Sequence, residues 1–174
     1  HRAYVNNGGD IALHLQEGES YTSAMVGHDG RKLGEIIIQS EYNVGGIATS
    51  GRHGRSLSCG IADSVTVLSS CAAKADVAAT LIANAVDLVK HPAITRSPAN
   101  EVVDDSDLGN RPVVVGCGPL TQSDRNTALR AGLDCALTMV KQNAIHAAAL
   151  FLQNDTLETE SDMLIPYSRT KEHA

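Results

Sequence analysis

The feature that most constrains the fold is an amphipathic helical repeat at residues 72–89. Residues 64–68 before it alternate as a strand does, and Ser69 and Ser70 are good N-cap residues. Apolar side chains then recur every three or four residues and share one helix face: Val77, Ala78, Leu81, Ile82, Ala85, Val86 and Val89. The spacing therefore predicts a strand followed directly by a helix with one buried side.

Short strand patterns precede this helix. They occur at residues 3–5, 11–15, 23–26, 35–39 and 46–49, separated by Gly-rich turns. An antiparallel meander is the simplest assembly of these segments. Residues 91–110 contain Pro92, Pro98 and an acidic cluster, Asp104, Asp105 and Asp107, which indicates an irregular surface connection.

A second helix is predicted after a buried strand at residues 112–115. Ser123 is its expected N-cap, and an apolar stripe continues over about eight turns through Leu129, Leu133, Leu137, Val140, Ala144, Ala148 and Phe151. Strands grouped early and helices grouped late indicate an α+β fold, an antiparallel sheet packed with two long helices. We expect one domain over residues 1–174, with residues 155–174 as a C-terminal tail.

Charge and cysteine content limit the classes of partner. The formal net charge of -6 argues against general nucleic-acid binding, which needs a basic surface. No apolar run approaches the roughly 18 residues that would suggest a membrane span. The four cysteines have no metal-ligand spacing and fit reduced thiols. We therefore expect a cytoplasmic protein that binds neither nucleic acid nor membrane.

The segment 49–56 carries the strongest binding signal. No carboxylate occurs between Glu41 and Asp63, although the chain as a whole is acidic. Arginine forks, hydroxyls and glycine-freed amides are the groups that hold phosphate, and this segment supplies Thr49, Ser50, Gly51, Arg52, His53 and Arg55. The pattern slightly favours an anion site over a solvated basic loop whose arginines pair with nearby acids.

Two other groups of residues have alternative interpretations. The run Asn7, Gly8, Gly9 and Asp10 can bring backbone N–H groups close to a ligand, but spacing alone favours a hairpin turn. Asp76 and Thr80 are four residues apart, so both reach the same helix face. A carboxylate and a hydroxyl placed in this way suit Mg²⁺, yet such a pair alone is more often a solvated surface.

Taken in order, these segments resemble the ApbE-like superfamily. The motifs are VNNGGDI at 5–11, GIATSG at 46–51, SVTV at 64–67 and ADVAAT at 75–80. The residues around them, such as IADSV at 61–65, are most similar to the superfamily's short, functionally uncharacterised cytoplasmic branch. The resemblance reaches about Phe151 and implies a T-fold-like domain, with Mg²⁺ held by Asp76 and Thr80 and with FMN or FAD as the ligand. It also implies either a homo-oligomer or an N-terminal portion that this chain lacks.

The superfamily's characterised enzymes are Mg²⁺-dependent FAD:protein FMN transferases. In them a long insert with a His and a D-P-x-T-G-like run separates the T-S-G motif from the S-V-T-V strand, whereas only residues 52–63 lie between them here. We therefore expect a protein that binds a phosphorylated small molecule, with no reaction or catalytic residue assigned. Transferase activity is the first alternative. The second is an accessory role in reductive sulfur transfer to form homocysteine, with which this branch has been associated.

The shortened segment predicts that the protein does not transfer FMN to a protein side chain. His53 is the one remaining candidate base, and neighbouring arginines disfavour its taking a proton near neutral pH. After incubation of the full-length protein with FAD, Mg²⁺ and an acceptor protein, we expect no covalent flavin fluorescence in a denaturing gel. A fluorescent acceptor band that is lost in Asp76→Asn would make transferase the leading function.

Overall fold

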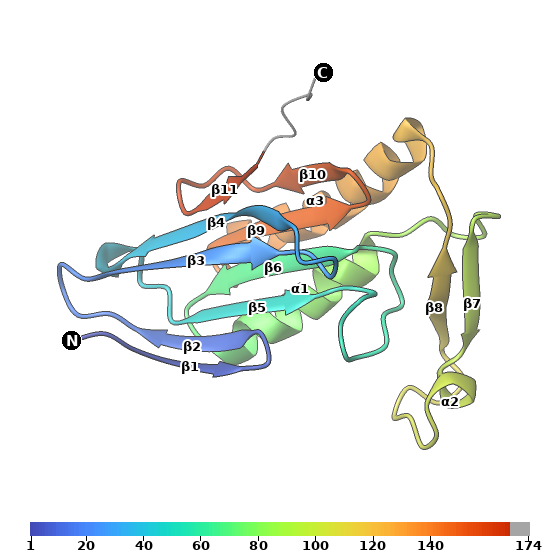
Figure 1. Ribbon diagram of the computed structural model, residues 1–174, viewed down its shortest axis with the longest axis horizontal. Coiled ribbons are helices and arrows are strands. Elements are labelled where there is room, and N and C mark those ends of the chain that lie inside the picture. Colours follow the sequence, from blue (N-terminus) through green and yellow to red (C-terminus); the bar gives the residue numbers. More distant parts are fainter. Residues whose placement is uncertain (168–174) are drawn as a thin grey trace.

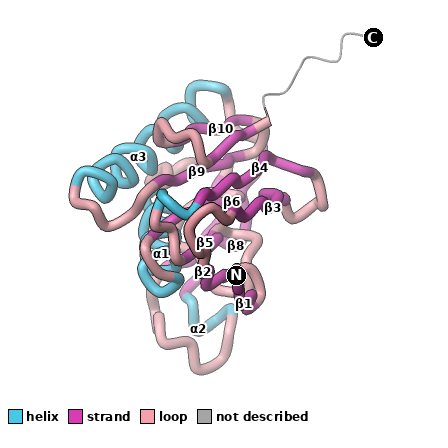
Figure 2. Tube along the Cα trace, turned by 90° about the vertical axis from the view of Figure 1, so that its left-hand side faces the viewer, coloured by secondary structure: helices cyan, strands magenta, loops and turns pink. Residues whose placement is uncertain are grey.

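Two strands of the main sheet, β6 (Ser64–Ser69) and β9 (Ala147–Leu152), are buried along their whole length. They pair with each other in a six-stranded antiparallel sheet of order β1-β2-β5-β6-β9-β10. Strands buried on both faces need a covering layer on each side. In the computed structural model, which describes residues 1–167, helices cover one face and a second sheet covers the other (Figure 1; Figure 2).

The second sheet packs on the main sheet through an apolar layer that includes Ile38, Ile47 and Phe151. It is three-stranded and antiparallel, with order β11-β4-β3. Its strands are β3 (Ser20–Val26), β4 (Lys32–Gln39) and β11 (Leu164–Pro166), and the remaining strands of the main sheet are β1 (Ala3–Asn7), β2 (Asp10–His14), β5 (Gly46–Ser50) and β10 (Asp155–Glu158).

Helices α1 (Ala72–Ala85) and α3 (Gln122–Lys141) lie on the opposite face of the main sheet (Figure 2). Their core contacts include Ile82, Leu129 and Leu150. A separate two-stranded sheet, β7 (Ile94–Pro98) and β8 (Pro112–Cys117), projects from this body, and the short helix α2 (Ala99–Val102) follows β7. A 3₁₀ turn, η1 (Ser40–Tyr42), precedes β5. None of the helices in the described part is long and apolar enough to cross a membrane.

The α+β class, the antiparallel pairing and the early strands are confirmed. The predicted single meander is wrong, because β3 and β4 pair in the second sheet and β2 pairs directly with β5. The predicted buried face of the first helix is only partly right, because Val77, Leu81 and Val89 are 59%, 50% and 82% exposed. The buried side is mostly alanine: Ala75, Ala78, Ala79, Ile82 and Ala83. The start of α1 also lies close to β5: a Cβ on Gly46 would lie 2.1 Å from the backbone nitrogen of Ala72.

The prediction that the second helix continues to Phe151 is wrong. It ends at Lys141, Asn143 adopts φ 55°, and residues 147–152 form the central strand β9. An Ala-rich segment is compatible with helix by propensity, but pairing with β6 on one edge and β10 on the other makes it a strand. Tertiary context has therefore overridden the local preference.

The predicted first residues of both helices, and two segments that were expected to lack regular structure, also need correction. Thr121, not Ser123, caps α3 in a capping box with Asp124, and Cys71, not Ser70, is the N-cap of α1. Residues 91–110, expected to be irregular, contain β7 and α2. Residues 155–167, expected to be a tail, contribute β10 and β11 to the two sheets, and residues 168–174 lie outside the described part.

Close packing at Gly60 gives a stability test. A Cβ at this position would lie 2.0 Å from the carbonyl oxygen of Ala83 and 2.8 Å from the Cα of Asn84, both backbone atoms that cannot rotate away. We expect Gly60→Ala to lower the free energy of unfolding by about 1–3 kcal/mol, as overpacking does. Urea denaturation measures this. The control is Gly116→Ala, whose Cβ meets Thr95 at an ordinary 3.6 Å, and equal losses in the two variants would contradict the packing argument.

Candidate functional site

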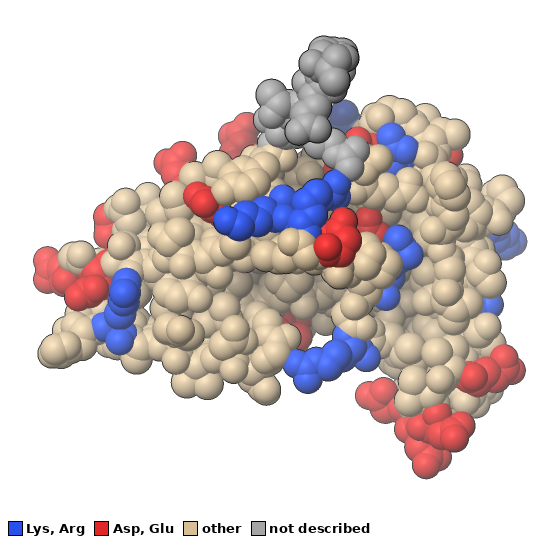
Figure 3. Space-filling view, in the orientation of Figure 1, with Lys and Arg blue, Asp and Glu red and all other residues tan. Residues whose placement is uncertain are grey.

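Most of the predicted site residues line one cavity of about 520 Å³. The cavity lies between the β1–β2 hairpin, the loop after β5 and the exposed side of α1. In the view of Figure 3 the molecular surface is hollowed in the middle, and charged side chains lie at the lower edge of the hollow. The lining includes Asn7, Gly8, Asp10, Thr49, Ser50, Gly51, His53, Arg55, Asp76 and Thr80. Segments far apart in the sequence are thus brought together, while Gly9 and Arg52 lie outside this lining.

The run at residues 7–10 is a hairpin turn, as its spacing favours. Asn7 pairs with Asp10, Gly8 and Gly9 have φ of 68° and 115°, and the side chain of Asn6 accepts a hydrogen bond of 2.9 Å from the Gly9 N–H. Positive φ at both central positions is the geometry that glycine adopts without strain. The same turn forms one wall of the cavity, so the turn and ligand interpretations are compatible.

Arg55 supplies the positive charge of this cavity. Its guanidinium lies against the turn, so close that a Cβ on Gly8 would overlap Nη2 at 1.4 Å. A larger residue here would displace the guanidinium, and it would also be strained at the Gly8 φ of 68°. Arg55 is exposed, and within residues 1–167 it makes no salt bridge. It therefore remains able to bind an anion.

Two carboxylates face the same cavity. Burial, and next the negative charge of Asp76, raise the pKa of Asp10, against the opposing effects of the Thr49 N–H and Arg55. Asp76 and Thr80 project from α1 as a carboxylate and a hydroxyl. These hard oxygen donors fit Mg²⁺ chemically. Within the described residues, no group of three or more His, Cys, Asp or Glu side chains forms a metal site, so a cation here would need oxygens from its ligand.

Arg52 points elsewhere. Its Nε and Nη2 donate to Asp63 Oδ1 at 2.8 and 2.7 Å, and both side chains are 18% exposed. The second oxygen of Asp63 accepts the backbone N–H of Gln153 in the β9–β10 turn. The alternative interpretation, an arginine paired with a nearby acid, therefore holds for Arg52 but not for Arg55.

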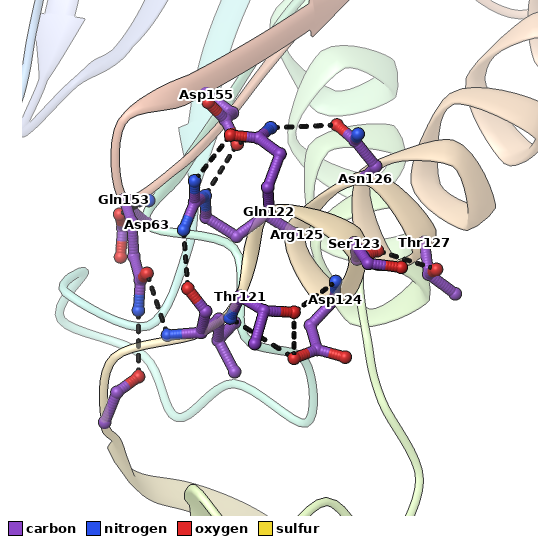
Figure 4. Close-up of polar contacts among 12 residues, drawn as sticks. Asp63, Thr121, Gln122, Ser123, Asp124, Arg125, Asn126, Thr127, Gln153 and Asp155 are labelled. Carbon is purple, nitrogen blue, oxygen red and sulfur yellow. Dashed lines mark hydrogen bonds and ion pairs between the residues drawn. The ribbon is translucent and has the colours of Figure 1, made fainter.

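The β9–β10 turn that receives Asp63 is itself held firmly. The Gln153 side chain donates to the Gly118 carbonyl at 2.8 Å and accepts the Leu120 N–H at 3.2 Å. Arg125 of α3 donates to Asp155 at 2.6 Å. Figure 4 shows Asp63 and Gln153 side by side beside the start of α3. Asp63 thus joins the site loop to a rigid part of the fold.

A stacked histidine pair lies beside Asp63. The ring of His53 stacks on that of His28, from the β3–β4 loop, at a centroid distance of 3.7 Å and an angle of 12°. His53 Nε2 lies 3.3 Å from Asp63 Oδ1. Burial is the main cause of a lowered His53 pKa, followed by the charges of Arg52 and His28, while Asp63 acts in the opposite direction. Sequence reasoning missed His28 and Asp63 as site residues, because nothing in local spacing links them to His53.

A second cavity of about 370 Å³ opens between the two sheets. It shares Gly8, Ser50 and His53 with the first, so the two cavities adjoin. Its floor is made of apolar side chains from both sheets: Ile11, Met25, Ile36 and Ile47. We call the first cavity the polar arm and the second the inner arm. No local sequence pattern indicates the inner arm, because it arises from the packing of the two sheets.

Comparison with known proteins gives a family match over most of the chain. A family model described as AbpE bacteria matches residues 1–161. UPF0280 proteins from Methanococcus maripaludis strains C7 and C6 are 40% and 39% identical over 87 residues, which are 47% of this chain and 34% of each relative. The matched region thus spans about a third of the length of these curated relatives. No solved structure matches the chain.

The different roles of the two arginines are testable by stability. We expect Arg52→Ala to lower the free energy of unfolding by about 1–3 kcal/mol, because it leaves the carboxylate of Asp63 without its charged donor. Arg55→Ala should change it by less than about 0.5 kcal/mol, as for a surface position. Urea denaturation of both variants decides the point. Equal destabilisation by the two substitutions would contradict the assignment.

Proposed function

We propose that this chain, which belongs to the family described as AbpE bacteria, binds a phosphorylated small molecule in the two-armed site, with FMN or FAD as the first candidate. The observation that carries the proposal is the convergence of Arg55, Gly8 of the hairpin turn and Ser50 on the polar arm. Thr49 lines the same cavity, and its hydroxyl pairs with that of Thr66 at 3.0 Å. An arginine guanidinium, exposed backbone N–H groups and hydroxyls are together the groups that usually bind phosphate.

The inner arm supports a ligand that carries a ring. Its apolar floor and its position between the sheets suit a planar group, and its volume lies in the range of small-molecule sites, about 300–1,000 Å³. The chain is poor in aromatic residues, at 3%, so contact with a ring would come from aliphatic side chains and from the His28–His53 pair. The phosphate would then lie in the polar arm and the ring in the inner arm.

Mg²⁺ is the proposed accompanying cation. Asp76 and Thr80 would hold it, and the neighbouring carboxylate of Asp10 adds negative charge. Bound there, the ion would neutralise phosphate charge. The ADVAAT, VNNGGDI and GIATSG motifs all contribute to this cavity, which supports the further proposal of an ApbE-like, T-fold-like relationship. A homo-oligomer and a cytoplasmic location stay predictions.

Calorimetric titration with FMN, with and without Mg²⁺, tests the proposal. We expect Mg²⁺ to tighten binding in the wild type and to have no such effect in Asp76→Asn. Arg55→Ala should weaken binding about tenfold or more, since a charged hydrogen bond contributes about 1.5–3 kcal/mol, and added salt should also weaken binding.

Asp134→Asn, an exposed substitution on α3, is the control and should titrate as the wild type does. An undiminished Mg²⁺ effect in Asp76→Asn would show that Asp76 is only a helix-surface residue. Unchanged affinity in Arg55→Ala for FMN, FAD and ATP alike would refute the phosphate site.

A further inference from the structure

We propose that the free edge of β10 is a docking site for an extended peptide segment, which adds to the main sheet as a further strand and places a Lys or Arg side chain against Glu158. This docking site is separate from the polar and inner arms and does not depend on their ligand. Three features of the structure support it: the unpaired edge of β10, the groove along that edge, and the charge of the groove.

β10 is the last strand of the main sheet, and among the described residues it pairs only with β9. The N–H of Thr159, directly after the strand, donates to the Ala148 carbonyl of β9 at 3.0 Å. Successive residues of an antiparallel strand direct their backbone groups to opposite sides, so those of Thr156 and Glu158 point away from β9. Within the described residues these N–H and C=O groups have no partner. They are therefore available to an added strand.

A groove of about 540 Å³ runs along this edge. One wall is the start of α3, with Gln122 and Asn126, and the other is the end of β11, with Pro166 and the adjacent Tyr167. Figure 2 shows α3 and the second sheet on opposite sides of β10. At the other edge of the sheet all five residues of β1 are exposed, whereas three of the four residues of β10 are half-buried. A strand added to β10 would therefore be enclosed on two sides.

The wall formed by β11 suits a long basic side chain. Successive side chains of β10 point to opposite walls. Leu157 packs in the core on the helix side, so Thr156 and Glu158 point to the β11 side. Pro166 and Tyr167, whose ring is 44% exposed, lie on that wall. They offer apolar surface to the methylene stem of a Lys or Arg, whose charged end can then reach Glu158.

The wall formed by α3 suits short polar side chains. Gln122 donates to Asp155 at 2.8 Å and to Asn126 at 3.3 Å (Figure 4). Asn126 accepts this bond through its oxygen, which leaves its own side-chain N–H groups open toward the groove. A hydroxyl at alternate positions of the peptide can accept from such an amide. The two walls therefore favour different residue types on the two faces of the added strand.

The charge of the groove favours a basic peptide. No Lys or Arg is among the described residues that line it. Asp155 is paired with Arg125 at 2.6 Å, whereas Glu158 has no ion pair in the described part of the chain. Partial burial raises the Glu158 pKa, and a cation beside this carboxylate would oppose that effect. Arg31 and Lys32 line a smaller cavity of about 130 Å³ at the turn before β10, so the basic residue of the peptide belongs at the Glu158 end.

Titration of the full chain with the peptide acetyl-Val-Thr-Lys-Thr-Val-amide tests the docking site. The Lys and Val side chains of this probe face one wall and its Thr side chains face the other. Calorimetry measures the affinity, and amide hydrogen exchange followed by NMR locates the complex. The N–H groups of Thr156 and Glu158 should become protected, while that of Leu157, which points to β9, should change little. Protection of neither edge amide, or no binding up to about 1 mM peptide, would overturn the proposal.

Two substitutions at one position separate the backbone edge from the side chain. Because the Thr156 N–H points away from β9, Thr156→Pro removes a donor to the peptide and keeps the pairing within the sheet, as prolines on edge strands do. We expect it to weaken binding about tenfold or more, since one hydrogen bond is lost and the ring obstructs the incoming strand. Thr156→Val, the matched control, keeps the N–H and should bind within about threefold of the wild type. Equal affinity in the two variants would refute strand addition.

Substitutions at Glu158 test the charge pairing, and they remain informative if Thr156→Pro does not fold. Glu158→Gln should weaken binding of the Lys peptide about two- to fivefold, the contribution of a cross-strand ion pair. Glu160→Gln, at an exposed carboxylate outside the groove, should leave it unchanged. In Glu158→Lys the preference should reverse, so that a peptide with Glu in place of Lys binds more tightly than the original. Equal affinity of the Lys peptide for the wild type and Glu158→Lys would refute the pairing.

Other occupants of the groove give different results in the same measurements. Displacement of the peptide by an equal concentration of acetyl-lysine amide would show a simple cation site. Self-association of the unliganded chain in analytical ultracentrifugation, if lost in Thr156→Pro, would show that a second copy covers the edge. Either result would overturn docking of a basic peptide. FMN affinity should be the same in all these variants, so the proposed function of the two arms is tested separately.

Discussion

The complete burial of β6 and β9 is the constraint on which the rest of the structure depends. The backbone N–H and C=O groups of such strands are hydrogen-bonded to the neighbouring strands. Their two apolar faces each require a covering layer. Helices α1 and α3 form one layer and the sheet β3-β4-β11 forms the other. The inner arm lies at one end of the space between the sheets. The layered packing that stabilises the fold therefore also creates half of the site.

The central sheet also sets the contents of the polar arm. β5 pairs with β6 and ends in Thr49 and Ser50, while β2 pairs with β5 and presents Asp10 at the end of its hairpin. Helix α1 packs on the same strands and places Asp76 and Thr80 beside them. Asp63 then fixes the one long loop of the site through Arg52 and the β9–β10 turn. Regular elements thus hold most of the polar groups at fixed places.

Much of this was predictable from local patterns. Paired glycines predicted the hairpin at residues 7–10, alternation predicted the strand at 64–68, and the site segments that sequence analysis selected do meet in one cavity. The errors arose where contacts between residues far apart in the sequence determine the local structure or the pairing of a side chain. Residues 147–152 have helix-compatible composition and became a strand by pairing with β6. Arg52 and Arg55 look equivalent in sequence, but only Arg52 lies within reach of Asp63. The stacking of His28 on His53 joins loops of different sheets, so no local pattern indicates it.

Hydrogen–deuterium exchange with saturating FMN tests the central claim, a ligand that spans both arms, most directly. The account predicts slower amide exchange in three segments that line the arms: residues 8–10, 50–55 and 25–28. Residues 154–158, which line a separate polar cavity beside β10, should exchange at the unliganded rate. Protection at residues 154–158 with none in the three site segments would contradict the account.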